Sequence, residues 1–556
     1  MWLRRAPLHT FLFSLYPAAY LYAGNIMFVR LEDTLRPLAV SFGLAIFFLI
    51  SFRIIVKSWR RAGVLCTVLI AMFFSFGHLA NLLPLLRPAF QGGLPNITAI
   101  AWGWLAIFLI LTFIVIQARL PVGISLFLNV AAVVLLAFPL ATITSTLLAN
   151  SSLSRQSEKT RLSEIRQEDL AEASLRKLSP GELPDIYYII FDSYERADVL
   201  QTLYGFDNSA FIQELNRRGF YVASSSRSNY LNTTYSLNTA LNLVYYKDFP
   251  PGLLMTARYN LQTNYVSEFL REQGYQIVVF DSGTGDSNDQ YADVFVSPAP
   301  QKTGSAPAIN AFETLLIRTT MGILLFKGGS NADSTSRGGP VLAETVNREL
   351  DVRRQRIIHT FAHLPDFASS KQPHFIFAHI YLPHYPFLFG PGGEELKYHE
   401  NMNLYWYEPE PANHIEQYID QVKYLNQAVL PAIDKILANS TKPAVIILQS
   451  DHGDSRFIDW NAPTTQGIHA RSATLNAVYF PDQDYDTLYP TMTTVNTFRL
   501  VFNHWFGTTY PLLPDRVYFH KHSAATSPGD IPQFIDACGQ FNLCLPDLSG
   551  AIRSDR

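Results

Sequence analysis

The sequence predicts an α/β domain with a mainly parallel sheet between helices, preceded by a bundle of transmembrane helices. Two observations carry this prediction. Before about residue 150 the apolar residues form long runs, and a helix needs about 20 apolar residues to span a bilayer. From Pro184 onward, short strand-like apolar runs alternate with helical stretches, the pattern of parallel strands joined by helices. We therefore expect a transmembrane domain at residues 1–150, a helical juxtamembrane linker at 151–183 and a globular domain at 184–556.

Five stretches of the first part qualify as membrane spans. They are Thr10–Phe28, Pro37–Phe52, Gly63–Leu86, Ala99–Gln117 and Val122–Ala149. Basic residues in short loops mark the cytoplasmic side of a membrane. One side carries Arg4, Arg5, Arg53, Lys57, Arg60, Arg61 and Arg119, and the other carries Arg30, Arg36 and Arg87. We therefore expect a multi-pass protein of the plasma (inner) membrane with a cytoplasmic N-terminus and an extracytoplasmic globular domain; one span more or fewer would reverse this orientation.

Charge and cysteine content limit the partners of the chain. The net charge is -3, from 43 basic and 46 acidic residues, so we expect no nucleic-acid partner. Cys66 lies in an apolar run and is expected to be inert packing. Cys538 and Cys544 stand close together near the C-terminus, and the sequence leaves open whether they form a disulfide in an oxidising compartment.

An apolar stretch, Phe312–Phe326, interrupts the α/β pattern between two flexible segments. Its composition is compatible with a helix, and two placements remain open. It is either a helix of the protein core or a helix that lies on the bilayer surface beside the active site.

Four apolar runs of the globular part end in acids or histidines. Ile186–Phe191 ends at Asp192, Ile277–Phe280 at Asp281, Phe375–Ala378 at His379, and Val445–Leu448 shortly before Asp451. Because ligands of α/β proteins bind at the carboxyl ends of the strands, we expect a site at this edge. His452 and Gly453 follow Asp451; a carboxylate and an imidazole together bind a divalent ion, and glycine allows close approach of the backbone.

A polar loop that leads into a predicted helix contains a candidate nucleophile. Thr233 and Thr234 precede Ser236–Val244, so either hydroxyl would face the positive end of a helix dipole. Beside a metal ion, such a hydroxyl ionises more readily and attacks phosphorus or sulfur. The residues alone do not separate the two threonines.

The order of these features resembles the sulfatase-like branch of the alkaline phosphatase superfamily. The order is Asp192, Thr233-x-x-Ser236, His384-Tyr-Pro-Phe387 and Ser450-Asp-His-Gly453, within Pro184 to Phe519. The preceding spans are similar to the layout of lipoteichoic acid synthases and phosphoethanolamine transferases. The resemblance implies an alkaline-phosphatase/sulfatase-like α/β fold and one divalent metal ion, manganese or zinc, held by Asp192, Thr233, Asp451 and His452. It also makes Thr233 the nucleophile, because Thr233 stands three residues before Ser236.

Further residues take roles from the same resemblance or from their charge. His384 matches the histidine that contacts the transferred group, and His469 aligns more loosely as a second catalytic histidine. Asn229 belongs to the phrase Asn-Tyr-x-x-Thr-x-x-Ser, which resembles bacterial membrane sulfatase-like proteins. Arg196 and Arg456 are candidates for neutralising an anionic substrate.

A departure from the family pattern shapes the expected function. Arylsulfatases carry a Cys- or Ser-x-Pro-Ser-Arg sequence, and this chain has a threonine in that position. We therefore expect an exofacial phosphotransferase that moves a phospho-head-group from a membrane lipid donor to an envelope glycan or lipid acceptor. The alternatives are a hydrolase, either a phosphodiesterase or a sulfuric ester hydrolase, and a non-catalytic membrane partner; the joint presence of the four ligand residues argues against the last.

Overall fold

The computed structural model describes most of the chain. The described residues are 6–26, 31–82, 97–121, 123–149, 163–166, 182–250, 263–283, 292–298, 311–322, 340–397, 413–520 and 533–541, with positions 175, 261, 287, 324 and 543. They form two compact units. One contains Met1–Ser151 and Gln301–Glu344, and the other contains Ser152–Pro300 and Thr345–Arg556. The predicted linker at 151–183 lies mostly outside the described residues.

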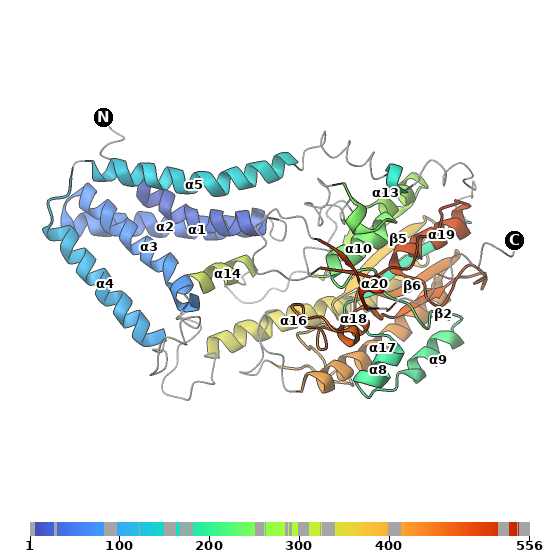
Figure 1. Cartoon of the computed structure of the whole chain (residues 1–556). Coiled ribbons are helices and arrows are strands. Elements are labelled where there is room, and N and C mark those ends of the chain that lie inside the picture. The colour runs from blue at the N-terminus through green and yellow to red at the C-terminus, as the bar shows by residue number, and fades with distance from the viewer. Residues whose placement is uncertain are drawn as a thin grey trace. The chain divides into compact units, whose positions relative to one another are not determined.

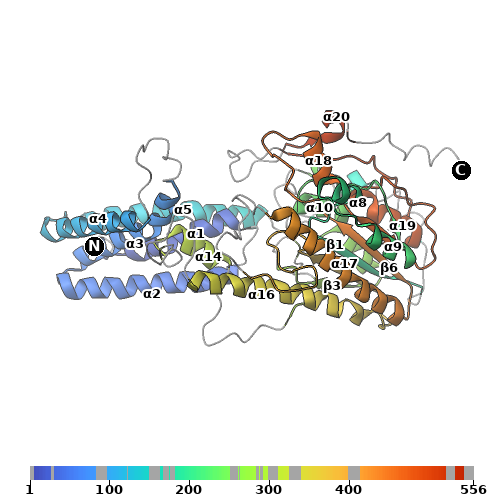
Figure 2. The same ribbon diagram turned by 90° about the horizontal axis from the view of Figure 1, so that it is seen from below.

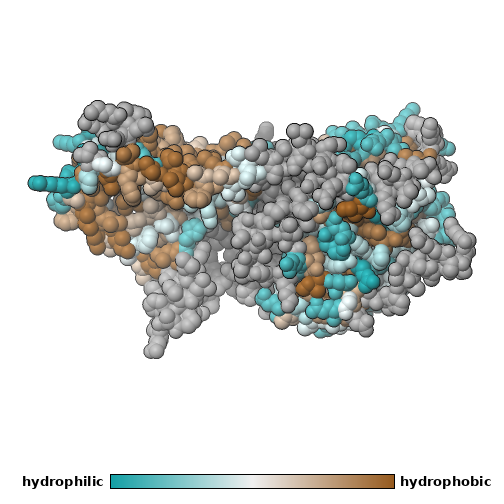
Figure 3. Space-filling view, turned by 45° about the horizontal axis from the view of Figure 1, so that its top comes forward, coloured by the Kyte–Doolittle hydropathy of each residue, from teal (hydrophilic) through white to brown (hydrophobic). Residues whose placement is uncertain are grey.

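The N-terminal unit is built from helices at all five predicted spans. They are α1 (His9–Asn25), α2 (Leu31–Val56), α3 (Trp59–Leu82), α4 (Ile97–Gln117) and α5 (Ile124–Ala149). Four of them, α2 to α5, are long and apolar enough to cross a membrane. Figure 3 shows apolar side chains spread over the surface of this unit. The shorter α1 has 17 residues and carries buried polar groups: the His9 backbone N–H donates to Asn129 Oδ1 at 2.7 Å, and His9 Nδ1 lies 2.6 Å from Thr67 Oγ1.

The apolar stretch after residue 311 belongs to this N-terminal unit, which therefore contains a segment beyond the predicted transmembrane domain at residues 1–150. It forms α14 (Ala311–Thr319), a shorter helix than the sequence suggested. Phe312 and Leu316 of α14 pack in one cluster with Ala18 and Tyr22 of α1. The helix is therefore a packed part of the helical bundle, because its apolar side faces other helices of the same unit.

The second unit is organised around a seven-stranded, mainly parallel sheet, as predicted. The strands follow the order β2 (Tyr221–Val222), β7 (Asn476–Tyr479), β6 (Ala444–Ser450), β1 (Asp185–Phe191), β5 (His374–Ile380), β3 (Gln276–Phe280) and β4 (Val294–Val296). The neighbours from β6 to β4 pair in parallel, whereas β7 and β2 pair antiparallel at one edge. Every residue of β1, β5 and β6 is buried, as expected for central strands with helices on both faces.

Helices cover both faces of this sheet (Figures 1 and 2). The helices that lie wholly or mainly in this unit are α8 (Ala197–Leu203), α9 (Ser209–Arg217), α10 (Thr233–Asn242), α13 (Tyr265–Glu272), α16 (Pro340–His363), α17 (His414–Asn439), α18 (Thr465–Ser472), α19 (Thr497–Phe506) and α20 (Ala537–Phe541). A small two-stranded sheet pairs β8 (Tyr518–Phe519) with β9 (Ile535–Asp536). The core connects the sheet to α19. The ring of Tyr188 in β1 lies 5.7 Å from that of Phe377 in β5 and 5.0 Å from that of Phe498 in α19.

Strand register brings the expected site together. Phe191, the last residue of β1, is paired with Ile380 of β5 and with Ser450 of β6. The residues that follow these three strands therefore emerge side by side at the carboxyl edge of the sheet. Strand β3 does not contribute in the same way, because Asp281 after it is engaged by Arg356, whose Nε lies 3.0 Å from Asp281 Oδ2.

The cysteines differ in state. Cys66 is free and buried in the helical bundle, as expected for inert packing. Cys538 is disulfide-bonded, while Cys544 lies outside the described residues.

Candidate active site

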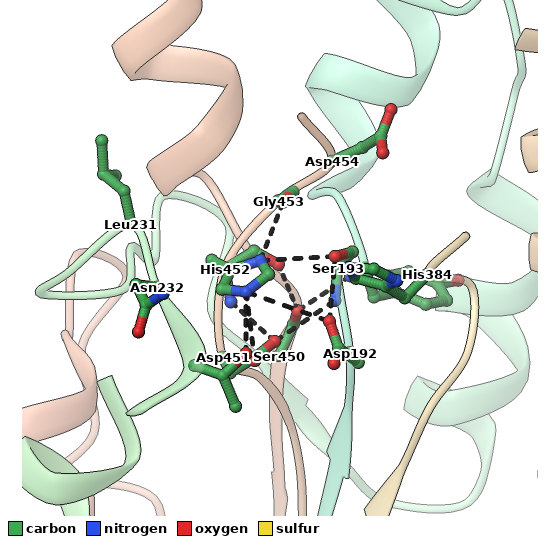
Figure 4. Close-up of polar contacts among 12 residues, drawn as sticks. Asp192, Ser193, Leu231, Asn232, His384, Ser450, Asp451, His452, Gly453 and Asp454 are labelled. Atoms are coloured by element: carbon green, nitrogen blue, oxygen red, sulfur yellow. Dashed lines mark hydrogen bonds and ion pairs between the residues drawn. The ribbon is translucent and has the colours of Figure 1, made fainter. Parts of the chain in front are cut away.

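Three of the predicted metal ligands converge at the carboxyl edge of the sheet (Figure 4). Asp192 follows β1, and Asp451 and His452 follow β6. Ligand atoms of the three all lie within 4.8 Å of one another, and all three side chains are buried. His452 Nε2 lies 3.3 Å from Asp451 Oδ2 and 3.9 Å from Asp192 Oδ1. A single cation between them would reach all three groups.

The backbone after β1 is strained to make this arrangement. Ser193 has a φ of 68°, a left-handed conformation that non-glycine residues rarely adopt. In that conformation its N–H donates to Asp451 Oδ1 at 3.2 Å and its hydroxyl donates to Asp192 Oδ1 at 3.0 Å. Such strain persists only where the surrounding structure enforces it, and it concentrates at functional sites. Ser193 therefore joins the two carboxylates from separate strands.

Gly453 is required by close packing. A Cβ at this position would stand 2.4 Å from the carbonyl oxygen of Ala470 and 2.7 Å from the carboxylate of Glu195. Only glycine therefore lets the segment after His452 pass between these groups. The Gly453 carbonyl also accepts a hydrogen bond from His452 Nδ1 at 2.9 Å. Because Nδ1 carries the proton, the lone pair of Nε2 points toward the carboxylates, which is the usual tautomer of a metal-binding histidine.

Thr233 is the first residue of α10, and its hydroxyl reaches the same point. Asn232 caps the helix by accepting a hydrogen bond from the backbone N–H of Thr234 at 3.0 Å. The Thr233 hydroxyl donates to His452 Nε2 at 3.0 Å. It thus lies at the positive end of a helix dipole and beside the cluster of Asp192, Asp451 and His452.

Burial and charge give the three ligand residues unusual acidities. Burial, together with the charge of Asp192, raises the pKa of Asp451 to about 7. Burial opposes ionisation of Asp192 too, but His384, His379 and His452 hold its pKa below the usual range. Burial, with the charge of Arg471 beside it, lowers the pKa of His452 well below its usual value, so that its imidazole is neutral near pH 7.

The donor set fits a divalent cation. Asp192 Oδ2 and Asp451 Oδ2 are buried, and neither has a donor in hydrogen-bonding geometry among the described residues. Two adjacent buried carboxylates repel each other unless a cation or a proton lies between them. Two carboxylate oxygens, an imidazole nitrogen and a hydroxyl are ligands that zinc and manganese both accept. Asp192, Asp451, His452 and Thr233 would hold such an ion.

Two histidines approach the carboxylates from β5 and the loop after it. His379 Nε2 lies 3.4 Å from Asp192 Oδ2 and 4.0 Å from Asp451 Oδ2. The backbone N–H of His384 donates to the carbonyl of Asp192 at 3.1 Å, and its Nδ1 donates to the carbonyl of Tyr385. The sequence placed His379 near the end of a strand and gave it no role. Because β5 pairs with β1, the structure brings this histidine beside the carboxylates of Asp192 and Asp451.

Arg471 is a further residue that sequence reasoning missed. It is buried, and its guanidinium donates to the carbonyls of Leu231 and Gly453, with Nη2 3.3 Å from His452 Nε2. These contacts tie the loop before Thr233 to the loop after Asp451. Because Arg471 lies on a short helix distant in sequence from both loops, no local pattern marks it.

The remaining predicted residues contact groups outside the cluster of Asp192, Asp451 and His452. Arg196 is buried and forms a two-point ion pair with Asp198 at 2.6 and 2.8 Å. His469 lies 3.3 Å from Arg227 and 3.9 Å from Asp198. Arg196 and His469 therefore share one neighbour, the carboxylate of Asp198.

Asn229 and Arg456 also have identified neighbours. The Asn229 Oδ1 accepts from the hydroxyl of Thr494 and the N–H of Val495, both at 2.7 Å, and thereby fixes the loop before Thr233. Arg456 is exposed, and its backbone N–H donates to Asp454 Oδ2 at 3.3 Å.

The Sulfatase family model matches residues 184–505, which is more than half of the chain and includes all the residues of the cluster. The chain belongs to the Sulfatase family. It is therefore a sulfatase-like enzyme of the transferase or hydrolase type, and its family resemblance was correctly predicted from the sequence. No curated protein sequence matches this chain.

Solved structures resemble this sulfatase-family chain at low identity. The C-terminal periplasmic domain of EcEptC from Escherichia coli, in complex with Zn, has 11% identity and a TM-score of 0.38, covering 68% of this chain and 97% of that one. The integral membrane protein lipooligosaccharide phosphoethanolamine transferase A (EptA) from Neisseria meningitidis has 14% identity and a TM-score of 0.36, covering 89% and 95%. Similarities of this size carry no argument about the substrate.

Proposed function

We propose that this sulfatase-family chain is a metal-dependent phosphotransferase with Thr233 as its nucleophile. The observation that carries the proposal is the 3.0 Å distance between the Thr233 hydroxyl and His452 Nε2, at a cluster of two buried carboxylates and an imidazole. A threonine in this position lacks the thiol or hydroxymethyl group that arylsulfatases convert to formylglycine. The chemistry left to it is direct attack on a phosphate or sulfate ester.

The transfer proceeds in two in-line steps. A bound divalent ion, manganese or zinc, supplies Lewis acidity that favours the ionised hydroxyl and offsets charge on the transferred group. Thr233 Oγ1 loses its proton and forms a bond to phosphorus, while the bond from phosphorus to the lipid alcohol breaks and that alcohol takes up a proton. The oxygen of an acceptor hydroxyl then forms a bond to the same phosphorus, the bond from phosphorus to Thr233 Oγ1 breaks, and the proton lost by the acceptor is balanced by a proton taken up at Thr233 Oγ1.

The other residues of the site position these reactants. The dipole of α10 stabilises negative charge at Thr233, since the N-terminus of a helix carries a partial positive charge. Arg471 holds the threonine loop against the Asp451 loop and places a positive charge beside His452. His384, buried beside Asp192, is the candidate for contact with the transferred group or its leaving oxygen.

The helical unit gives the reason for a lipid donor. Helices α2 to α5 have the length and composition of membrane spans, so the enzyme is held where lipid head groups are present. With α1 as the fifth span and the cytoplasmic N-terminus predicted from the basic loops, the site faces an extracytoplasmic space. The proposed acceptor is accordingly an envelope glycan or lipid.

Transfer of radiolabelled head group tests this function. The purified full-length chain, loaded with manganese or zinc, is incubated with phosphatidylethanolamine labelled in its phosphate and with an envelope lipid or saccharide fraction. Label on the acceptor fraction is the expected result. Label released to water instead would identify a phosphodiesterase, and release of sulfate from a sulfate ester, without movement of phosphate label, would identify a sulfatase.

A further inference from the structure

An apolar cavity lies in the N-terminal unit. It has a volume of about 510 Å³ and lies between α2, α3 and α14. Ligand pockets in proteins are typically about 300–1,000 Å³ in volume. Its walls are apolar over nearly their whole extent, and the charged side chains that line it are Arg36 and Glu313.

The cavity follows one stripe of α2. Val40, Leu44 and Phe48 all line it, and residues four apart lie on the same face of a helix. From Arg36 to Phe48 the lining extends over 12 residue steps, or about 18 Å along the helix axis. The hydrocarbon core of a bilayer is about 30 Å thick, so one leaflet is roughly 15 Å deep. The cavity is therefore about as long as one leaflet is deep.

Its other walls come from α3 and α14. Ile70 and Phe73 line it from α3, and Leu316 lines it from α14. Val40 and Leu44 are 55% and 46% exposed although both are large and apolar, which is typical of side chains that contact lipid. A water-filled cavity of this composition would be unfavourable, because its walls offer few hydrogen bonds.

The charged pair lies at one end of the cavity. Arg36 Nε and Nη2 both donate to the carboxylate of Glu313, and the Arg36 side chain is 38% exposed whereas that of Glu313 is 11% exposed. Arg36 lies in the second turn of α2, where a membrane span approaches the head-group region. The guanidinium is therefore the more accessible of the two charged groups, and guanidinium groups favour phosphate.

We propose that this cavity binds one acyl chain of a membrane glycerophospholipid, with the lipid phosphate beside Arg36. The apolar walls match the acyl chain, and the length of the cavity matches the depth to which that chain enters one leaflet. The guanidinium of Arg36 at one end matches the charge of the lipid phosphate. The binding is independent of the transfer reaction proposed above, so the chain with Thr233→Ala is expected to bind the lipid as the wild type does.

Native mass spectrometry of the full-length chain, titrated with phosphatidylethanolamine in mild detergent, tests the proposal. Saturation at about one tightly bound phospholipid per chain is expected. Leu44→Trp fills the cavity and is expected to weaken binding by about tenfold or more. Ile46→Trp is the matched control: Ile46 is 39% exposed on the same helix and does not line the cavity, so this variant should bind normally.

Two further measurements keep the result decisive. Equal thermal unfolding of the two tryptophan variants shows that Leu44→Trp has not simply misfolded. Diacylglycerol, which lacks the phosphate, should bind at least about fivefold more weakly than phosphatidylethanolamine. Binding that never saturates, an equal effect of the two tryptophan substitutions, or equal binding of diacylglycerol would overturn the proposal.

Discussion

Buried polar groups serve opposite purposes in the two units of this chain. In the helical unit, the backbone N–H of His9 donates to Asn129 and the His9 ring pairs with Thr67, which fastens α1 to α5 and α3. At the sheet edge of the other unit, Asp192 and Asp451 are held together although they carry like charge. The His9 backbone N–H and Nδ1 have partners within the protein, whereas the two carboxylates are stabilised only by a cation or a proton between them. The hydrogen bonds of His9 are explained by stability of the helical unit. The pair of like-charged carboxylates indicates a site that binds a cation.

Removal of the proposed nucleophile should give the largest loss of activity of all the variants considered, with almost no loss of stability. Thr233→Ala deletes the hydroxyl beside His452, so head-group transfer should fall by about 10³-fold or more, while the unfolding temperature stays nearly unchanged. Thr234→Ala is the matched control and should retain activity within about tenfold. Loss of turnover in Thr234→Ala, with activity retained in Thr233→Ala, would show that the other threonine is the nucleophile.

The metal content should depend on one aspartate of the sheet edge and not on another. Metal analysis of the wild type should find about one ion per chain, and Asp451→Ala should weaken binding by about 100-fold or more, because it removes a charged ligand. Asp281→Ala, which lacks the acid at the end of β3 instead, should keep the ion, since Asp281 pairs with Arg356. Two tightly held ions per chain would contradict the single-metal site.

Arg471 should matter more for activity than Arg456, one of the two arginines that the sequence suggested. Arg471→Ala breaks the contacts between the threonine loop and the Asp451 loop, and loss of such supporting contacts typically costs about 10- to 100-fold in activity or metal affinity. Arg456→Ala, at an exposed position, should lower activity by less than about fivefold. The measurement is kcat/KM of the two variants. A larger loss in Arg456→Ala than in Arg471→Ala would contradict this prediction and would support a role for Arg456 in substrate binding.

Metal affinity should weaken as the pH falls. The pKa of Asp451 is raised to about 7, so below that pH the metal-free site holds a proton that the ion must displace. Affinity should therefore be constant above about pH 7 and decrease below it, by up to about tenfold per pH unit. The pKa of His452 is lowered well below 6.5, so this imidazole adds no step near pH 7, where Asp451 titrates. Isothermal titration between pH 5.5 and 8 checks this; equal affinity throughout would refute the paired-carboxylate argument.

The smallest effect is expected in the helical unit. Asn129→Ala removes the hydrogen bonds to His9 and to the carbonyl of Ala6, and hydrogen bonds between membrane helices typically contribute about 0.6 kcal/mol, at most about 1.7. Thermal unfolding should shift by a few degrees at most, and metal content should not change. A loss of metal in this variant would show that the two kinds of polar group are coupled.

The sequence predicted the fold and the convergence of Asp192, Asp451 and His452, because both depend on patterns along the chain. Apolar runs that end in Asp192 and Asp451 identified two strands of a parallel sheet, and parallel register brings such ends together without further information. It could not predict Arg471, Ser193 or the place of α14. Arg471 acts across two loops distant in sequence, the left-handed φ of Ser193 follows from its neighbours, and α14 joins the N-terminal helices only because packing partners are available there.

The central claim is that Thr233 forms a covalent bond to the transferred group. The most direct test is to incubate the metal-loaded chain with labelled phosphatidylethanolamine, quench it, and measure the mass of the peptide that contains Thr233. The account predicts a phospho-head-group on Thr233 in the wild type and none in Thr233→Ala. A modification on Thr234, or transfer that proceeds at full rate while no labelled peptide can be trapped from the wild type, would contradict it.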